Sequence, residues 1–142
     1  MTLSNTMTYN TAMVYEALLQ RIMDSDVNIR HTIVADLDGN IITVNHRDGV
    51  TNFLSKDETA ASLKRAAEAW KARKQLAPKI GKGMYAVAAF EKITRITFPL
   101  GESNLLFVSL GSEKMRTDLN AGGQQQIVQH VMNILSGDPT LA

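Results

Sequence analysis

The stretch 33–44, read as I-V-A-D-L-D-G-N-I-I-T-V, decides the fold because two short apolar runs meet in it at Asp38-Gly39. Asp-Gly between β-prone segments predicts a hairpin, since a type I′ turn needs positive φ at both of its central residues. The two antiparallel strands are expected at about 30–37 and 40–45. A sheet therefore begins early in the chain.

The segments on either side of this hairpin predict the remaining elements. A first helix, capped by Asn10 or Thr11, is expected to reach about residue 23, because apolar residues recur there at helical spacing. A capping box, S-K-D-E, begins a second helix at Ser55. We expect this helix to end near residue 77, because Pro78 disfavours the helical conformation of the residue before it. Three strand-like runs and a closing helix follow, at 84–91, 93–100, 105–110 and within 119–135.

Two apolar patterns indicate how these elements pack. Leu63, Ala66, Ala67 and Trp70 form one stripe of the second helix, and its small alanines allow a close approach to a sheet. The run 105–110 is nearly continuous in apolar residues, which is typical of a central strand covered on both faces. The order helix, two strands, helix, three strands, helix predicts an α+β fold in which helices pack on one sheet.

The composition is typical of a single folded domain of 142 residues, with 44% hydrophobic and 20% charged residues. The absence of cysteine excludes disulfides and thiolate chemistry. The first 15 residues contain no Lys or Arg, and the longest apolar run, 84–90, is too short to cross a bilayer. We therefore expect a soluble, cytoplasmic protein without a membrane span.

Charge is distributed unevenly, although the net charge is +1. The segment 56–95 holds ten basic and four acidic residues, whereas the rest of the chain holds five basic and ten acidic ones. A basic patch within this segment would attract an acidic partner. The plainer alternative is a solvated helix face. The patch consists of Lys64, Lys71, Lys74, Lys79 and Lys82.

No motif for catalysis or metal binding has the spacing that its chemistry requires. The run from Asp36 begins like a calcium-binding loop, but its sixth and twelfth positions are Ile41 and Arg47 instead of Gly and a carboxylate. The three histidines are too widely spaced to form a zinc site, and the sequence has no Gly-x-Ser-x-Gly nucleophile elbow. We expect the protein to be no enzyme and to hold neither metal nor cofactor.

Two groups of residues remain as candidate ligand sites. His46, Arg47 and Asp48 lie in a loop, where an Arg and a carboxylate can hold a small polar ligand. A turn with a surface ion pair explains these residues equally well. Trp70 and Arg73 belong to the basic run that leads from the second helix to the third strand. A core tryptophan beside solvated lysines is the competing interpretation.

The order of elements and two motifs together resemble the roadblock/LC7 domain, a profilin-like sandwich. The stretch 33–44 is similar to the opening hairpin of that family. R-I-T-F-P-L-G-E-S-N-L-L-F-V-S-L, at 95–110, is similar to its fourth strand, Pro-Leu-Gly turn and fifth strand. Further details look like a group of small uncharacterised archaeal proteins, namely Trp70, Arg73, the segment 79–82 and the loop 47–49.

This resemblance implies a five-stranded antiparallel sheet in the order 2-1-5-4-3, with the first and last helices on one face and the Ser55 helix on the other. The domain would span 10–136, with flexible ends at 1–9 and 137–142. Strand three would be an edge, and an edge as apolar as 84–90 needs a partner. Roadblock domains pair two copies there and pack their middle helices together. The interface implied here consists of Leu63, Ala67, Met84, Tyr85, Val87 and Phe90.

Members of the family act as non-catalytic scaffolds or regulators, often of small GTPases. The resemblance therefore implies a homodimer that binds a GTPase or another acidic protein. The basic middle helix argues against close packing of two copies, unless its cations point outward. A PAS- or GAF-like sensor, with a small-molecule pocket near Trp70, His46 and Arg47, is the alternative. Weak nucleic-acid binding through the basic segment 64–82 is a third interpretation, which the near-neutral net charge disfavours.

Overall fold

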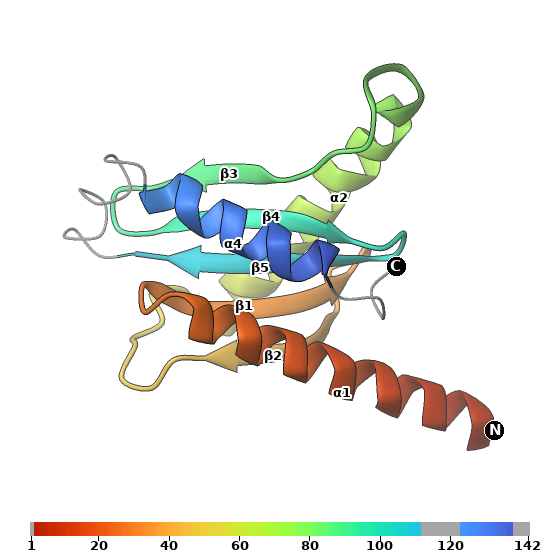
Figure 1. The fold of residues 1–142 in the computed structure, drawn as a ribbon, viewed down its shortest axis with the longest axis horizontal. Coiled ribbons are helices and arrows are strands. Elements are labelled where there is room, and N and C mark those ends of the chain that lie inside the picture. The colour runs from red at the N-terminus through yellow and green to blue at the C-terminus, as the bar shows by residue number, and fades with distance from the viewer. Residues whose placement is uncertain (1, 112–122, 138–142) are drawn as a thin grey trace.

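A five-stranded antiparallel sheet forms the middle layer of the molecule, with two helices on one face and one on the other (Figure 1). The computed structural model describes residues 2–111 and 123–137, with side chains from residue 12 onward. The strand order is β2-β1-β5-β4-β3, α1 and α4 cover one face, and α2 covers the other. This is the predicted α+β sandwich. Its elements are α1 (Thr2–Ser25), β1 (Ile29–Asp36), β2 (Ile41–His46), α2 (Lys56–Ile80), β3 (Ala86–Ala89), β4 (Thr94–Leu100), β5 (Asn104–Leu110) and α4 (Gln124–Ser136).

The hairpin between β1 and β2 is present, but its turn is not the predicted type I′ turn. Gly39 has a φ of +87°, and none of the described non-glycine residues has positive φ. The Gly39 N–H donates to the Asp36 carbonyl at 3.1 Å, and the Asp36 N–H donates to the Asn40 carbonyl at 2.9 Å. These bonds define a type I turn followed by a glycine bulge, the usual form of a three-residue hairpin loop.

The Asp36 side chain stabilises this turn. Its carboxylate accepts the backbone N–H groups of Asn40 and Asp38, both at 2.9 Å. These hydrogen bonds, that of Asn40 first, hold the pKa of Asp36 below its usual range. Asp36 therefore has the backbone-bonding role that aspartate commonly has beside turns.

Three element boundaries differ from those expected. α1 begins at Thr2 instead of near residue 10. α2 continues through Pro78 to Ile80, because a proline so near the end removes a single backbone hydrogen bond. β3 is limited to Ala86–Ala89, because the preceding residues lead back from the end of α2, which projects beyond the sheet (Figure 1). The first part of the expected closing helix, 119–122, lies outside the described residues.

Each face of the sheet carries its own apolar core. The larger core lies under α1 and α4, around Phe98. The smaller one contains Leu63, Ala67 and Trp70, which belong to the predicted stripe of α2. β5 is central, and every residue from 105 to 110 is buried, as its apolar run predicted. Within residues 2–111 and 123–137, no helix has the length and apolar character needed to cross a membrane.

Candidate functional site

The open edge of the sheet at β3 carries a group of exposed apolar side chains. Met84 and Phe90 are 61% and 55% exposed, and Tyr85 and Val87 are exposed beside them. Apolar side chains of this size and number are usually covered in a soluble protein. The four residues are part of the expected dimer interface, and all of them lie within 84–90, in and beside β3.

The backbone of β3 also leaves hydrogen-bonding groups unpaired. β3 pairs with β4 alone among the described strands. The Phe90 N–H donates to the Ile93 carbonyl at 2.8 Å. Because bonded pairs alternate along an antiparallel ladder, the N–H groups of Val87 and Ala89 point to the open side. A second strand can therefore add to this edge.

Two residues of the expected interface belong to the interior instead. Leu63 and Ala67 are buried in the core between α2 and the sheet. Their side chains pack on the chain's own β-strands, so they are not on the surface that a second copy could contact. The helix stripe that faces the sheet cannot also face a neighbour, which is the physical reason for this correction.

Two lysines of α2, Lys64 and Lys71, lie on the flank that faces the β1–β2 turn. Lys64 and Lys71 are two turns apart on one side of the helix. The Lys64 backbone lies against Gly39, and the Lys71 Nζ lies 3.0 Å from the Asp38 carboxylate. This flank therefore faces away from β3.

The opposite flank of α2 faces β4 and β3 and has a different composition. Ser62, Ala69, Leu76 and Ile80 fall on it by helical spacing. The Arg95 guanidinium of β4 donates to the Ser62 hydroxyl, which places this flank over that side of the sheet. The flank carries no lysine, and its cations are Arg65 and Arg73. Lys64 and Lys71 thus lie away from the open edge, whereas Arg65 and Arg73 lie on the flank toward it.

A hollow of about 550 Å³ lies between the end of α2, the segment before β3 and the β4–β5 turn. Trp70 lines it, although this residue is only 3% exposed, and its Nε1 donates to the Thr97 hydroxyl at 2.8 Å. The Arg73 guanidinium lies 4.9 Å from the centre of the indole ring. A Cβ on Gly83 would lie 2.4 Å from a ring carbon, so only glycine fits there. Trp70 is thus a core residue that also lines a surface hollow.

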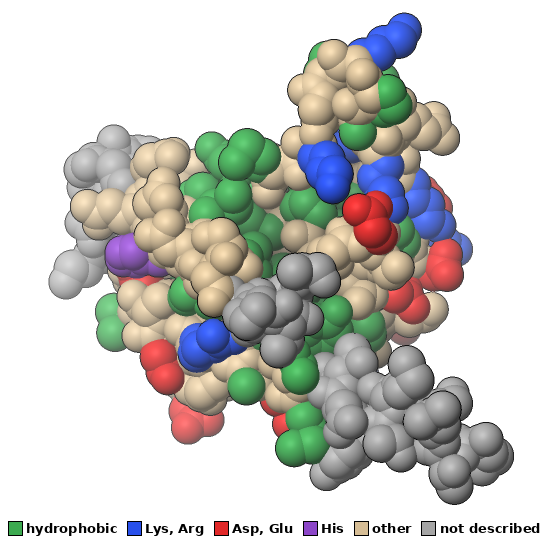
Figure 2. Space-filling view, turned by 45° about the vertical axis from the view of Figure 1, so that its right-hand side comes forward, with side chains coloured by type: hydrophobic (Ala, Val, Ile, Leu, Met, Phe, Trp, Pro, Cys, Tyr) green, Lys and Arg blue, Asp and Glu red, His purple; other side chains and the backbone are tan. Residues whose placement is uncertain are grey.

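Two lysines of the basic patch meet an acidic side chain at this hollow. The Glu102 carboxylate of the β4–β5 turn lies 3.6 Å from Lys74 and 3.7 Å from Lys82. Lys74 also donates to the Glu102 carbonyl at 2.6 Å. Figure 2 shows Lys and Arg side chains gathered over the projecting end of α2, beside acidic ones. Glu102 was not among the predicted site residues, because this side chain approaches the lysines only in the folded chain.

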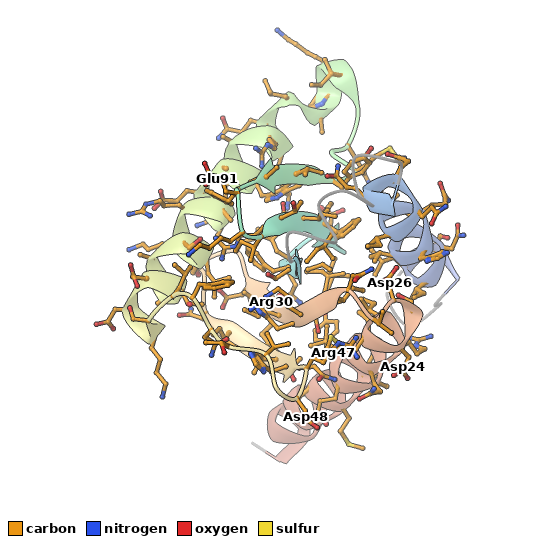
Figure 3. The ribbon with its side chains drawn as sticks, turned by 90° about the vertical axis from the view of Figure 1, so that its left-hand side faces the viewer. Asp24, Asp26, Arg30, Arg47, Asp48 and Glu91 are labelled. Atoms are coloured by element: carbon orange, nitrogen blue, oxygen red, sulfur yellow. The ribbon has the colours of Figure 1, made fainter. Side chains whose placement is uncertain are left out.

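Arg47 has a structural role at the end of α1. Its Nε donates to the Ile29 carbonyl at 2.7 Å, and a terminal nitrogen donates to the carbonyls of Met23 and Asp26 at 2.7 and 3.1 Å. Carbonyls at a helix C-terminus lack helical partners, and a cation there is favourable. Figure 3 shows Arg47 between β2 and the end of α1, close to Asp26, with Asp48 farther out.

The structure does not bring the five predicted ligand residues into one cavity. His46 stacks on His31 with ring centres 5.9 Å apart, and its Nε2 lies 2.9 Å from the Asn52 side-chain oxygen. β1 and β5 separate β2 from β4, where Trp70 is anchored, so the two groups are about 14 Å apart across the sheet. In the described part of the chain, no group of three His, Asp or Glu residues is arranged to hold a metal ion.

Neither a protein-family model nor a curated protein sequence matches the chain. Solved structures do match it over most of its length. The gliding protein MglB of Thermus thermophilus has a TM-score of 0.57 at 14% identity, covering 92% of this chain and 93% of its own. A structure described as MglB with tetrameric arrangement gives 0.58 at 14% identity, with coverages of 91% and 90%.

A roadblock/LC7 domain from Streptomyces avermitilis has a TM-score of 0.51 at 13% identity, covering 84% of this chain and 95% of its own. At such low identities the similarity concerns the fold and not the activity. It agrees with the observed sheet order and with the two motifs at 33–44 and 95–110. This chain therefore has the fold of a roadblock/LC7 domain.

Proposed function

We propose that the chain is a non-catalytic protein-binding module that acts as a homodimer, paired through the open edge at β3. One observation carries this proposal: among the described strands, β3 has an open edge, and exposed apolar side chains lie along it. The neighbouring flank of α2 carries no lysine. Antiparallel pairing of two β3 strands about a twofold axis would continue one sheet through both copies and bring the α2 helices together. The MglB structure described as tetrameric supports self-association as compatible with this fold.

The distribution of charge supports close packing of two α2 helices in such a dimer. The lysines at 64 and 71 lie on the flank away from β3. The flank next to β3 offers Ala69, Leu76 and Ile80, of which the latter two are exposed. Two copies would thus bring these apolar side chains together beside Arg65 and Arg73, while Lys64 and Lys71 would remain in solvent.

The dimer can be tested with Ala89→Pro, since proline lacks the N–H that points to the open side of β3. Ala89→Ser, which keeps the backbone N–H, is the matched control. By sedimentation velocity we expect the wild type and the serine variant to be dimers, and the proline variant to be a monomer with an unchanged circular dichroism spectrum. A wild type that is monomeric at high micromolar concentration, or a proline variant that remains dimeric, would contradict the proposal.

The partner that we propose is an acidic protein surface, with a small GTPase as the class that the roadblock resemblance implies. Lys64 and Lys79 form no ion pair with any described residue, and in a β3-paired dimer their side of α2 would remain accessible. Binding of purified small GTPases should weaken as salt is added. The double variant Lys64→Glu/Lys79→Glu should bind less tightly than the wild type, whereas Lys56→Glu should change little. Equal binding by the wild type, the double variant and Lys56→Glu would contradict this proposal, because the partner would then not bind at Lys64 and Lys79.

A small-molecule sensor is the second candidate function, because the hollow beside Trp70 has a volume in the range of ligand pockets. Ligands that bind the folded chain raise its melting temperature. A thermal-shift screen with metabolites and nucleotides should then yield a compound whose effect is lost in Arg73→Gln. No stabilisation by any compound would remove this candidate.

A further inference from the structure

A row of polar side chains crosses the sheet on the face that α2 covers. The strand register sets Arg95 of β4 opposite Ser109 of β5, and Ser109 opposite His31 of β1. His31 is in turn opposite His46 of β2. Directly opposed residues of neighbouring strands point to the same face, so the row lies on one side of four adjacent strands.

The middle of this row borders a small cavity at the beginning of α2. The cavity has a volume of about 30 Å³, and Arg30, His31, Arg95 and Ser109 are among the residues that line it. Thr59 of α2 closes it from the helix side. The volume is that of a single water-sized group. Within the described residues the lining includes cations and hydroxyls but no carboxylate.

The Ser109 hydroxyl is unsatisfied in this cavity. The residue is only 3% exposed, and its Oγ has no hydrogen-bond partner in the part of the chain that the structure describes. Buried polar groups are normally hydrogen-bonded, because an unpaired one has lost its water without compensation. The hydroxyl therefore indicates that another group belongs at this position.

The arginines beside Ser109 form no ion pair with a described residue. Arg95 is partly buried, and desolvation lowers its pKa. Its hydrogen bond within the described chain is to the neutral Ser62 hydroxyl. Arg30 donates to the carbonyls of Gly111 and Thr51 at 3.2 and 2.6 Å. Arg30 also lies over the Phe53 ring, with its Cζ 4.8 Å from the ring centre. Because buried charges are usually paired, it is the partly buried Arg95 guanidinium that most favours an anion in the cavity.

We propose that the cavity binds an oxyanion, one oxygen of which enters between Arg95 and Ser109. The oxygen would accept a hydrogen bond from the Ser109 hydroxyl and a charge-assisted one from the Arg95 guanidinium. The cavity has room for that single oxygen, and the rest of the group would lie toward the exposed residues Thr51 and Asn52 at its mouth. The ligand is therefore a carboxylate or a phosphate group.

Two neighbouring acids of the described residues, Glu58 and Glu91, do not serve as this anion. The Glu58 carboxylate accepts the Ser55 N–H at 2.9 Å in the capping box. Glu91, at the turn after β3, lies well apart from Arg30 in Figure 3. It lines a neighbouring hollow that Arg95 also borders, but no ion pair within 4.0 Å joins the two side chains. Among residues 2–111 and 123–137, no carboxylate thus fills the position next to Ser109, and we assign it to the ligand.

His31 provides a spectroscopic reporter of occupancy. Burial, followed by His46, Arg95 and Arg30, lowers the pKa of His31 to about 4. An anion in the cavity would oppose these cations and raise that pKa. The rise can be measured from the imidazole proton shifts in an NMR pH titration, and it is independent of any biological activity.

The test is an NMR titration of the full chain with inorganic phosphate and, separately, with acetate. We expect saturable shifts of the amides at 31, 95 and 109 and a raised His31 pKa. Ser109→Ala should weaken binding several-fold, and Arg95→Gln should weaken it about tenfold or more, because charged hydrogen bonds are the stronger ones. Arg65→Gln, an exposed arginine of α2, is the matched control and should bind as the wild type does.

The two probes distinguish the sources of the anion, since tighter binding of phosphate indicates a phosphorylated ligand and tighter binding of acetate a carboxylate. Ser109→Ala also removes the unpaired hydroxyl, so this variant should fold at least as stably as the wild type. It therefore still tests the site if Arg95→Gln fails to fold. Shifts that do not saturate, or that persist unchanged in both site variants, would overturn the proposal and leave water as the occupant.

Discussion

Replacing Gly39 by alanine tests whether the β1–β2 turn lies against α2 as closely as the structure shows. A Cβ on Gly39 would lie 2.8 Å from the Lys64 Cα and 3.0 Å from the Lys64 nitrogen, both backbone atoms of a helix. Gly49 is the matched control, because its φ is +78° against +87° for Gly39, and nothing lies within 4 Å of its added Cβ. The two variants therefore share the backbone strain and differ in the contact.

The magnitudes follow from this comparison. A side chain in the left-handed region costs about 1–2 kcal/mol in both variants. Alanine also lowers the conformational entropy of the unfolded chain, which offsets about 0.4–1 kcal/mol of this cost in both variants. Only Gly39→Ala adds a clash with helix backbone, for which overpacking costs of about 1–3 kcal/mol are typical. We expect Gly39→Ala to lose about 2–4 kcal/mol of unfolding free energy and Gly49→Ala about 1 kcal/mol.

Urea unfolding followed by circular dichroism measures both losses. Unchanged m-values would show that the variants unfold from equally compact native states. Equal destabilisation of the two variants would refute the reasoning, because it would mean that the turn and α2 do not approach closely. A larger loss in Gly49→Ala would refute it more strongly.

Three further predictions concern single side chains. Trp70→Phe leaves the Thr97 hydroxyl without its donor and should lower the free energy of unfolding by about 1–2 kcal/mol, as measured by thermal or urea unfolding. Arg47→Gln leaves carbonyls at the end of α1 without their donor and should lower the free energy of unfolding by about 1–3 kcal/mol, with faster amide exchange in that turn. The control Asp48→Asn, at an exposed position, should leave the free energy of unfolding almost unchanged. Because the folded chain lowers the pKa of His31 from 6.5 to about 4, unfolding takes up a proton between these values. Stability should therefore fall as the pH drops through this window, and it should fall less in His31→Asn.

The parts of the fold that local sequence specifies could be predicted. The capping box at Ser55 and Glu58 forms with both of its hydrogen bonds, because its partners are three residues apart. The central position of β5 follows from its two-sided apolar run. The turn type at Gly39 could not be predicted, because Asp-Gly suits both a type I′ turn and a glycine bulge, and the register of the strands selects between them.

The candidate sites were less accessible to sequence reasoning, because their contacts join distant segments. Trp70, Arg73, Lys74 and Lys82 do line one hollow, since they are close in the chain and share a helix end. The role of Arg47 depends on carbonyls many residues earlier, which no local pattern identifies. The row at Arg95, Ser109 and His31 exists only through strand register, and each of the three residues is ordinary in its own segment.

The oxyanion cavity and the β3 edge lie close together, because Ala88 of β3 is directly opposite Arg95 of β4. We nevertheless expect them to act independently. The Arg95 guanidinium is directed to the α2 face, where it binds Ser62, whereas the groups that would pair two β3 strands lie in the plane of the sheet. Phosphate should thus leave the dissociation constant of the wild-type dimer unchanged, and Ala89→Pro should bind phosphate as the wild type does. A change in either measurement would contradict independence, and thermodynamic linkage would then require an equal and reciprocal change in the other.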